Sequence, residues 1–294
     1  VSTPLTLGAA QAWTNDNATG LLAVGSTVEN GGFLLTIGGT AAGGTTVSGE
    51  ISGAGGLANA TTTSGTLTLS GANSYSGGTT ITGILRAAHN SALGTGTVTV
   101  NTGTGNQLQL ADGVDVGNAL TINGGGVTAQ GVLYVPAGNA TYSGTINITA
   151  AQNSGGHFAT VTNTSVLTIA GDNTITSSVP VTIRNGTVVY TGAQNYTGGT
   201  SFNTADSRVL LQFAQPASMP ASGAVALMSG TSIGVNAGGA GEFTAGTDTG
   251  AGSIGGLLAG TGGQGAAVTW PAGSSLGIDT TNATGTVTFA NAFT

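Results

Sequence analysis

The chain contains no cysteine and no lysine, and its three cationic side chains are all arginine. Without cysteine there can be no disulfide, no thiolate metal site and no cysteine nucleophile. Three cations are too few for a basic surface that binds nucleic-acid phosphates or docks on an anionic membrane. The sequence also has no apolar run of about 18 residues, so no membrane-spanning helix is predicted. These absences argue against nucleic acid as a partner.

Charge and aromatic rings are scarce as well. Charged residues make up 4% of the chain and aromatic residues 5%, whereas hydrophobic residues make up 39% and glycine occurs 55 times. A disordered chain combines low hydrophobicity with high net charge, and collagen places glycine at every third position, so neither class fits. Solubility must depend on hydroxyl and amide groups, which makes self-association an expected property.

Short segments that alternate apolar residues with threonine or asparagine recur along most of the chain. Such period-2 runs between Gly, Asn and Ser predict half-buried β-strands. The clearest lie at 66–70, 97–101, 119–123, 145–149, 166–169, 181–183 and 286–289. Helical spacing is absent, apart from a possible short turn at 87–92. The sequence therefore predicts an all-β fold.

The predicted strands recur every 15–30 residues or so, a spacing typical of solenoids. One longer repeat is present: GANSYSGGT at 71–79 returns as GAQNYTGGT at 192–200. The shared tyrosine and paired glycines suit one inward-facing aromatic ring and one sharp corner in each copy. We interpret this echo as structural repetition.

Several of these segments resemble the autotransporter-associated β-strand repeat of bacterial surface proteins. The resemblance lies in GTLTLSGANSYSGGTT at 65–80 and its continuation NSALGTGTVTV at 90–100, with similar coils at 5–13 and 47–57. It is strong over 1–101, fair over 140–202 and compositional beyond. One departure is that Thr82-Gly83-Ile84-Leu85 stands where the family has Gly-Thr-Leu. The resemblance implies a right-handed parallel β-helix, exported and held at the bacterial cell surface.

The composition of the sequence changes near residue 206, where proline, methionine and clusters of glycine interrupt the repeats. We therefore predict a repetitive parallel β-helix over 1–205. For 206–294 we predict a less regular β-helix continuation or a small β-rich C-terminal region.

No catalytic, cofactor-binding or metal-binding residue is assigned from the sequence. The nearest carboxylate pair is Asp112 and Asp115, which suits a calcium loop but also an ordinary Asp-Gly turn. A carbohydrate-active enzyme would need two facing carboxyl groups, or carboxylates clustered with a cationic base. His157 is expected on the surface or in a turn, far from His89 in sequence.

The arginines, the aromatic residues and the sequons each allow a structural and a functional interpretation. Arg86 and Arg184 are expected to pair with carbonyl or carboxylate groups and not with a substrate. An outward aromatic stripe would bind sugars, but the core needs the same rings: Trp13, Tyr75, Tyr142, Tyr196 and Trp270. Eight Asn-x-Ser/Thr sequons are possible glycosylation sites: Asn17, Asn59, Asn139, Asn147, Asn163, Asn185, Asn195 and Asn282.

A coil of about 22 residues would give roughly a dozen coils, each pairing its backbone with its neighbours. The terminal coils expose unpaired edges, and no obvious cap is visible at either end. We therefore expect an extracellular structural rod that associates head-to-tail into a surface filament or matrix. The alternatives are a passenger segment of an adhesin that binds a glycan or host protein, and a carbohydrate-active enzyme.

Overall fold

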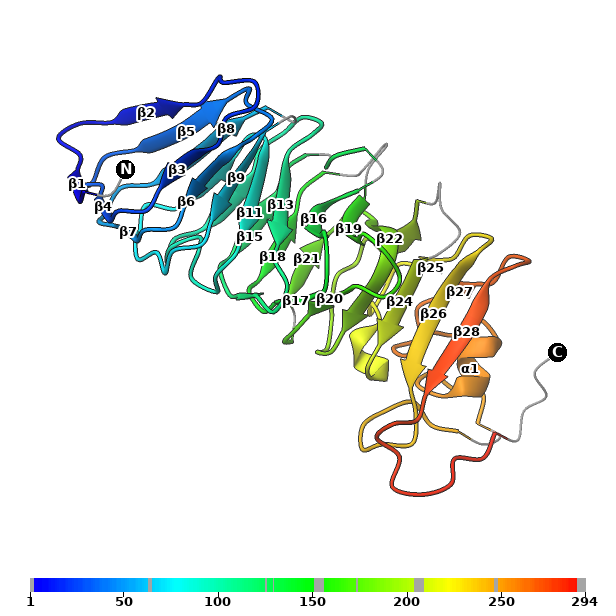
Figure 1. The fold of residues 1–294 in the computed structure, drawn as a ribbon. Coiled ribbons are helices and arrows are strands. Elements are labelled where there is room, and N and C mark those ends of the chain that lie inside the picture. The colour runs from blue at the N-terminus through cyan, green and yellow to red at the C-terminus, as the bar shows by residue number, and fades with distance from the viewer. Residues whose placement is uncertain are drawn as a thin grey trace.

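The computed structural model of the chain is an elongated stack of parallel β-strands. It describes residues 3–62, 65–124, 126–128, 130–150, 156–172, 174–203, 209–245 and 248–289. The chain winds through successive coils, and the two termini lie at opposite ends of the rod (Figure 1). All the strand pairs in its sheets are parallel, and they join strands of neighbouring coils. The predicted all-β parallel β-helix is confirmed.

Sheets I and II line two sides of the rod. Sheet I contains β2 (Gln11–Thr14), β5 (Leu35–Gly39), β8 (Leu57–Thr61), β10 (Thr79–Ile81), β12 (Val98–Val100), β15 (Leu120–Ile122), β18 (Ile146–Ile148) and β21 (Ile175–Ser177). Sheet II contains β3 (Leu22–Val24), β6 (Thr45–Val47), β9 (Thr66–Leu69), β11 (Ile84–Ala87), β13 (Gln107–Leu110), β16 (Gly131–Val135), β19 (Gly156–Thr160), β22 (Val181–Tyr190), β23 (Thr200–Phe202), β25 (Val225–Ala226) and β27 (Val268–Thr269).

Two further sheets lie on the remaining side. Sheet III is short and lies in the first coils, with β1 (Leu5–Thr6), β4 (Val28–Glu29) and β7 (Ile51–Ser52). Sheet IV begins farther along, with β14 (Asp115–Val116), β17 (Asn139–Tyr142), β20 (Val166–Ile169), the second half of β22, β24 (Val209–Phe213), β26 (Thr231–Asn236) and β28 (Ser275–Asp279). The strands at 209–279 thus extend ladders that begin earlier in the chain.

Sheet II has the longest ladder, with eleven strands from β3 to β27, close to the expected dozen coils. Its steps vary: Thr66 pairs with Ile84, only 18 residues later, and Leu108 with Leu133, 25 residues later. The last step, from Val225 to Val268, takes 43 residues. The extra chain forms a loop at 237–267 that holds the helix α1 (Ile254–Leu258).

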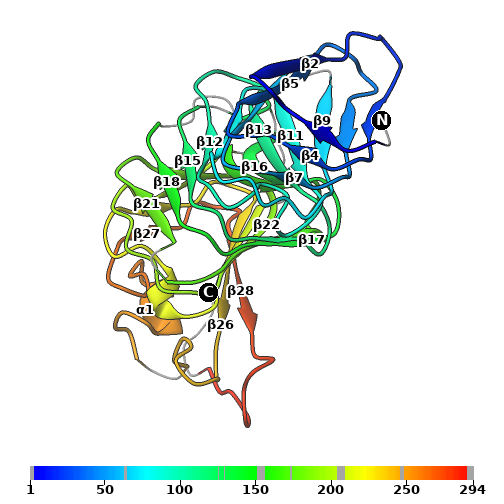
Figure 2. The same cartoon turned by 90° about the vertical axis from the view of Figure 1, so that its left-hand side faces the viewer.

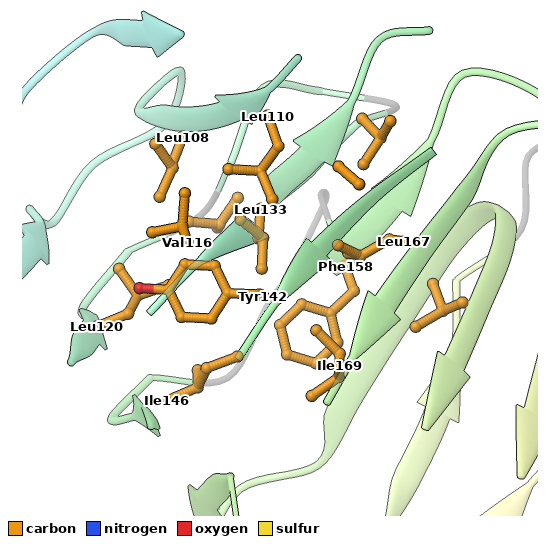
Figure 3. Close-up of a cluster of buried hydrophobic side chains, with 14 of the residues drawn as sticks. Leu108, Leu110, Val116, Leu120, Leu133, Tyr142, Ile146, Phe158, Leu167 and Ile169 are labelled. Carbon is orange, nitrogen blue, oxygen red and sulfur yellow. The ribbon is translucent and has the colours of Figure 1, made fainter. Parts of the chain in front are cut away.

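The core is a continuous column of aliphatic and aromatic side chains inside the coils. Alternation along each strand turns one set of side chains inward, and parallel register stacks equivalent residues. Four successive inward residues of sheet I are almost fully buried, namely Leu57, Thr79, Val98 and Leu120. In the middle of the rod, side chains from all sides meet, as Leu108 of sheet II, Leu120 of sheet I and Tyr142 of sheet IV show (Figure 3). Burial of this column is the main stabilising term.

The repeated segments at 71–79 and 192–200 fold in the same way. The hydroxyl groups of Tyr75 and Thr79 are 2.6 Å apart, and those of Tyr196 and Thr200 are also 2.6 Å apart. Ahead of each tyrosine, a side-chain amide caps a neighbouring strand: Asn73 Oδ1 accepts from Ile51 N, and its counterpart Gln194 Oε1 accepts from Ile175 N. Both tyrosines are buried, so the echo is structural repetition.

Most predicted strands are present, but one local expectation is wrong: residues 286–289 form no strand, and Phe289 instead packs against the core. The expected short turn in the segment 87–92 is present, with Ala92 N donating to His89 O at 3.0 Å. The helices of the described chain are α1 and the 3-10 turn η1 (Pro216–Ser218), and neither was predicted. No helix in these residues is long and apolar enough to cross a membrane.

An aromatic cluster fills the core near β22. The ring of Tyr190 makes edge contacts with Phe158, Tyr196 and Phe213, at centroid distances of 6.4, 6.5 and 5.7 Å. Its buried hydroxyl lies near that of Tyr196 but makes no hydrogen bond of ordinary distance and angle in the described part of the chain. A buried unpaired polar group destabilises the fold, so this hydroxyl is a local weakness in the core.

Replacing Tyr190 by phenylalanine should therefore raise the free energy of unfolding by about 1 kcal/mol, because the ring stays and the unpaired hydroxyl leaves. Tyr196→Phe is the matched control, since its hydroxyl bonds to Thr200. That variant should lose about 1 kcal/mol. Urea denaturation followed by circular dichroism measures both. Equal destabilisation by the two changes would contradict the prediction.

Candidate functional site

The N-terminal end of the rod has an apolar hollow that no described residue closes. Leu5, Trp13, Leu22 and Val24 come from β1, β2 and β3 and line a cavity of about 220 Å³. We call it the N-terminal hollow. Figure 2 views the molecule with this end toward the reader. Within the described residues, β1 and β2 each pair with the next coil only, so the outer backbone edges of these two strands are unpaired there.

The C-terminal end also presents apolar side chains that are only partly buried. Trp270, Leu276, Ile278 and Phe289 pack against the end of the core without being fully covered. Helix α1 fills one side of this last coil, and Trp270 Nε1 donates to Leu257 O at 2.9 Å. The expectation of no obvious cap therefore needs correction here, because the 237–267 loop closes one side of the coil.

A polar groove lies on the outside of the rod, beyond the last strands of sheet I. Residues 147–149, 176–178 and 195–197 line it, and its volume is about 570 Å³. The first two segments are β18 and β21 with the residues after them, and the third belongs to the second copy of the repeat. Asn147 and Thr176 are register partners, so their side chains lie next to each other on the outer face.

The groove has a fixed floor and free walls. Ile148, Ser177 and Tyr196 are buried and form the floor. The exposed side chains in the walls include five that make no hydrogen bond to the described part of the chain: Asn147, Thr176, Ser178, Asn195 and Thr197. Among the residues that the structure describes, the lining of the groove is uncharged and consists of hydroxyl, amide and apolar groups.

His157 lies in the core, so its expected place on the surface or in a turn is wrong. Its side chain is fully buried on β19. Nδ1 accepts a hydrogen bond from Thr182 N at 2.9 Å, and Nε2 is 3.0 Å from Ala150 O, which requires the neutral tautomer with hydrogen on Nε2. Burial lowers the pKa of His157 to about 4. The histidine is a structural core residue that stays neutral.

The carboxylates that suggested a calcium loop do not converge. Asp112 Oδ1 accepts from Asn139 N at 2.8 Å, whereas Asp115 Oδ1 accepts from the hydroxyl of Ser143 at 2.7 Å. Both aspartates thus hold the next coil in place. Among the described residues, no group of three or more His, Cys, Asp or Glu side chains is arranged to hold a metal ion.

The two arginines singled out in the sequence lie on sheet II. Arg184 is nearly buried, and its Nη1 donates to Asn203 Oδ1 at 2.6 Å, a side-chain carbonyl oxygen of the expected kind. Arg86 is half-buried and lies in register between Thr68 and Gln109. The structure therefore does not bring the arginines and the two aspartates into one site.

The aromatic residues do not form an outward stripe. Tyr75, Tyr142 and Tyr196 are buried in the core, and the two tryptophans lie at opposite ends of the rod. Of the eight sequons, Asn59 is buried inside sheet I, which excludes glycan attachment there in the folded chain. Asn147 and Asn195 line the polar groove.

Sequence reasoning missed the groove because its three segments meet only through coil register. The only available signal was the sequon pattern, since two of the three segments contain one. Comparison of the chain with models of protein families, with curated proteins and with solved structures finds no match. The candidate sites are therefore the two ends of the rod and the polar groove.

Proposed function

We propose that this chain is an extracellular structural protein, a β-helical rod that docks end to end into a filament or matrix. The resemblance to autotransporter-associated repeats supports a place at the bacterial cell surface. The observation that carries the proposal is the N-terminal hollow, where apolar side chains occur together with the outer edges of β1 and β2, which no described residue pairs.

The occupant of the hollow is the C-terminal end of a second copy. Most hydrophobic residues that are only partly buried at the edge of the core belong to the first or last coil. Leu5, Trp13 and Leu22 would face Trp270, Leu276 and Ile278 of the next rod. The outer edge of β27 is covered, because Val268 N donates to Gly260 O at 2.8 Å, so the strand that the described residues leave open at this end is β28, the last strand of sheet IV. Contacts between two different surfaces do not close, and they propagate into fibres.

Negative-stain electron microscopy at several protein concentrations tests this proposal. We expect fibres with an axial repeat of about 50 Å, because eleven strands spaced about 4.8 Å apart set the rod length. Isolated short rods at every concentration would overturn end-to-end assembly by this chain.

A charged variant sharpens the experiment. Trp13→Asp places a carboxylate in the N-terminal hollow, where docking would desolvate it, so fibres should disappear while the rod stays folded. Thr80→Asp adds the same charge at an exposed position in the middle of sheet I and should leave the fibres intact. Equal loss of fibres in both variants would show that the ends are not the contact.

The alternatives have different requirements. A carbohydrate-active enzyme needs carboxylates that face one another or an arginine, and Asp112 and Asp115 instead engage separate partners. An adhesin needs a ligand-binding surface outside the core. The polar groove is such a surface, and its ligand is a separate question.

A further inference from the structure

We propose that the polar groove binds a neutral oligosaccharide. This proposal does not rest on end-to-end docking, because the groove lies on the side of the rod. It stands on three observations: the uncharged lining, the free hydrogen-bonding groups and the fixed floor.

The lining matches the chemistry of a neutral sugar. Asn147 and Asn195 carry amides, which donate and accept hydrogen bonds, and the hydroxyls of Thr176, Ser178 and Thr197 do the same. Sugar hydroxyl groups have the same dual character, so each can be matched in either direction. Among the described lining residues, there is no cation for an anionic ligand to pair with and no carboxylate for a cationic one.

The spacing of these groups is set by the sheet. Asn147 and Thr176 are paired across strands, about 4.8 Å apart, and the exposed Thr149 and Ser178 follow about 6.8 Å farther along. Ring hydroxyls of one or two sugar units can reach such a grid. The volume of about 570 Å³ lies within the range of about 300–1,000 Å³ found for ligand sites.

The floor of the groove is held before any ligand arrives. Tyr196 is anchored by its hydroxyl contact with Thr200. The Ser177 hydroxyl donates to Val179 O at 2.6 Å, and Ser177 O accepts from Thr197 N at 3.1 Å. These bonds fix the backbone from which the wall side chains project. A preorganised site loses less conformational entropy when a ligand binds, so fewer contacts are needed for a given affinity.

The first copy of the repeat differs at the same positions. Ser74 corresponds to Asn195, but its hydroxyl donates to Glu50 Oε1 at 2.6 Å and is therefore already engaged. The free polar wall is consequently a feature of the second copy and does not follow from the repeat alone.

Saturation-transfer NMR and calorimetry with defined probes test the proposal. The probes are neutral tetrasaccharides of glucose, galactose and N-acetylglucosamine, with a sialylated trisaccharide as the charged comparison. The protein should come from a host without N-glycosylation, so that Asn147 and Asn195 carry no glycan. We expect at least one neutral probe to bind and the sialylated probe to bind more weakly.

The double variant Asn147→Ala/Thr176→Ala should weaken that binding at least tenfold. Thr80→Ala/Thr99→Ala is the matched control, because it removes outward side chains from the same sheet away from the groove and should bind like the parent chain. Circular dichroism and the unfolding midpoint establish that both variants fold. Binding of no neutral probe, preference for the sialylated probe, or equal binding by the two double variants would each overturn the proposal.

Discussion

Lowering the pH from 7 to 5 should destabilise the rod by about 2 kcal/mol through His157 alone. The pKa of His157 in the folded chain, about 4, lies below its ordinary value of 6.5. Between these two values the unfolded chain binds a proton at His157 and the folded chain does not. The contribution of neutral His157 to the free energy of unfolding is therefore fully present above about pH 6.5 and is lost as the pH falls toward 4. Each pKa unit corresponds to about 1.4 kcal/mol, so the complete loss is roughly 3 kcal/mol.

The hydrogen bonds of His157 give the same sign independently. Thr182 N donates to Nδ1, and a proton on Nδ1 would turn this bond into a contact between two donors. The imidazolium would also be charged inside the core, where burial penalises it. Protonation thus removes a bond that joins β19 to β22 and favours unfolding.

The measurement is the free energy of unfolding at pH 7, 6 and 5 for the parent chain and two variants. His157→Asn keeps an acceptor near Thr182 N but removes the titrating group, so its pH dependence over this range should largely vanish. His89→Asn changes the exposed histidine and should keep the dependence of the parent. A parent chain that is equally stable at pH 7 and 5 would contradict the prediction.

The strands and their stacking could be predicted because their signals are local. Alternating apolar and polar residues, as in 145–149, predict a strand with one inward and one outward face. The regular spacing of such strands along the chain predicts successive coils. His157 shows the limit of such reasoning. Nothing in Gly-Gly-His-Phe distinguishes a turn from a buried strand, and only the pairing of β19 with β16 and β22 buries the ring.

Helix α1 shows a second limit of prediction from the sequence. Its sequence Ile-Gly-Gly-Leu-Leu has poor helix propensity because it contains two adjacent glycines. The helix forms because Ser253 Oγ accepts from Gly256 N at 2.9 Å and because Ile254 and Leu257 are buried. Tertiary burial therefore overrides propensity. The polar groove likewise depends on three segments that only the coil register brings together.

Gly83→Ala should produce a similarly large loss of stability, about 3 kcal/mol, from backbone strain of 1–3 kcal/mol together with overpacking of similar size. Gly83 forms the corner between β10 and β11 with φ of 127°, a conformation that residues with a side chain rarely adopt. A Cβ atom there would also overlap the carbonyl oxygen of Thr61 in the preceding coil.

Substitutions of two other glycines separate the effect of backbone strain from that of overpacking. Gly113 has φ of 76° but no atom near its would-be Cβ, so Gly113→Ala should cost only about 1–2 kcal/mol. Gly8 has neither positive φ nor a close neighbour, and Gly8→Ala should be nearly neutral. Urea unfolding of the three variants measures the order. A loss at Gly83 no larger than that at Gly113 would show that the adjacent coil moves aside, and that close stacking at this corner contributes nothing to the stability of the rod.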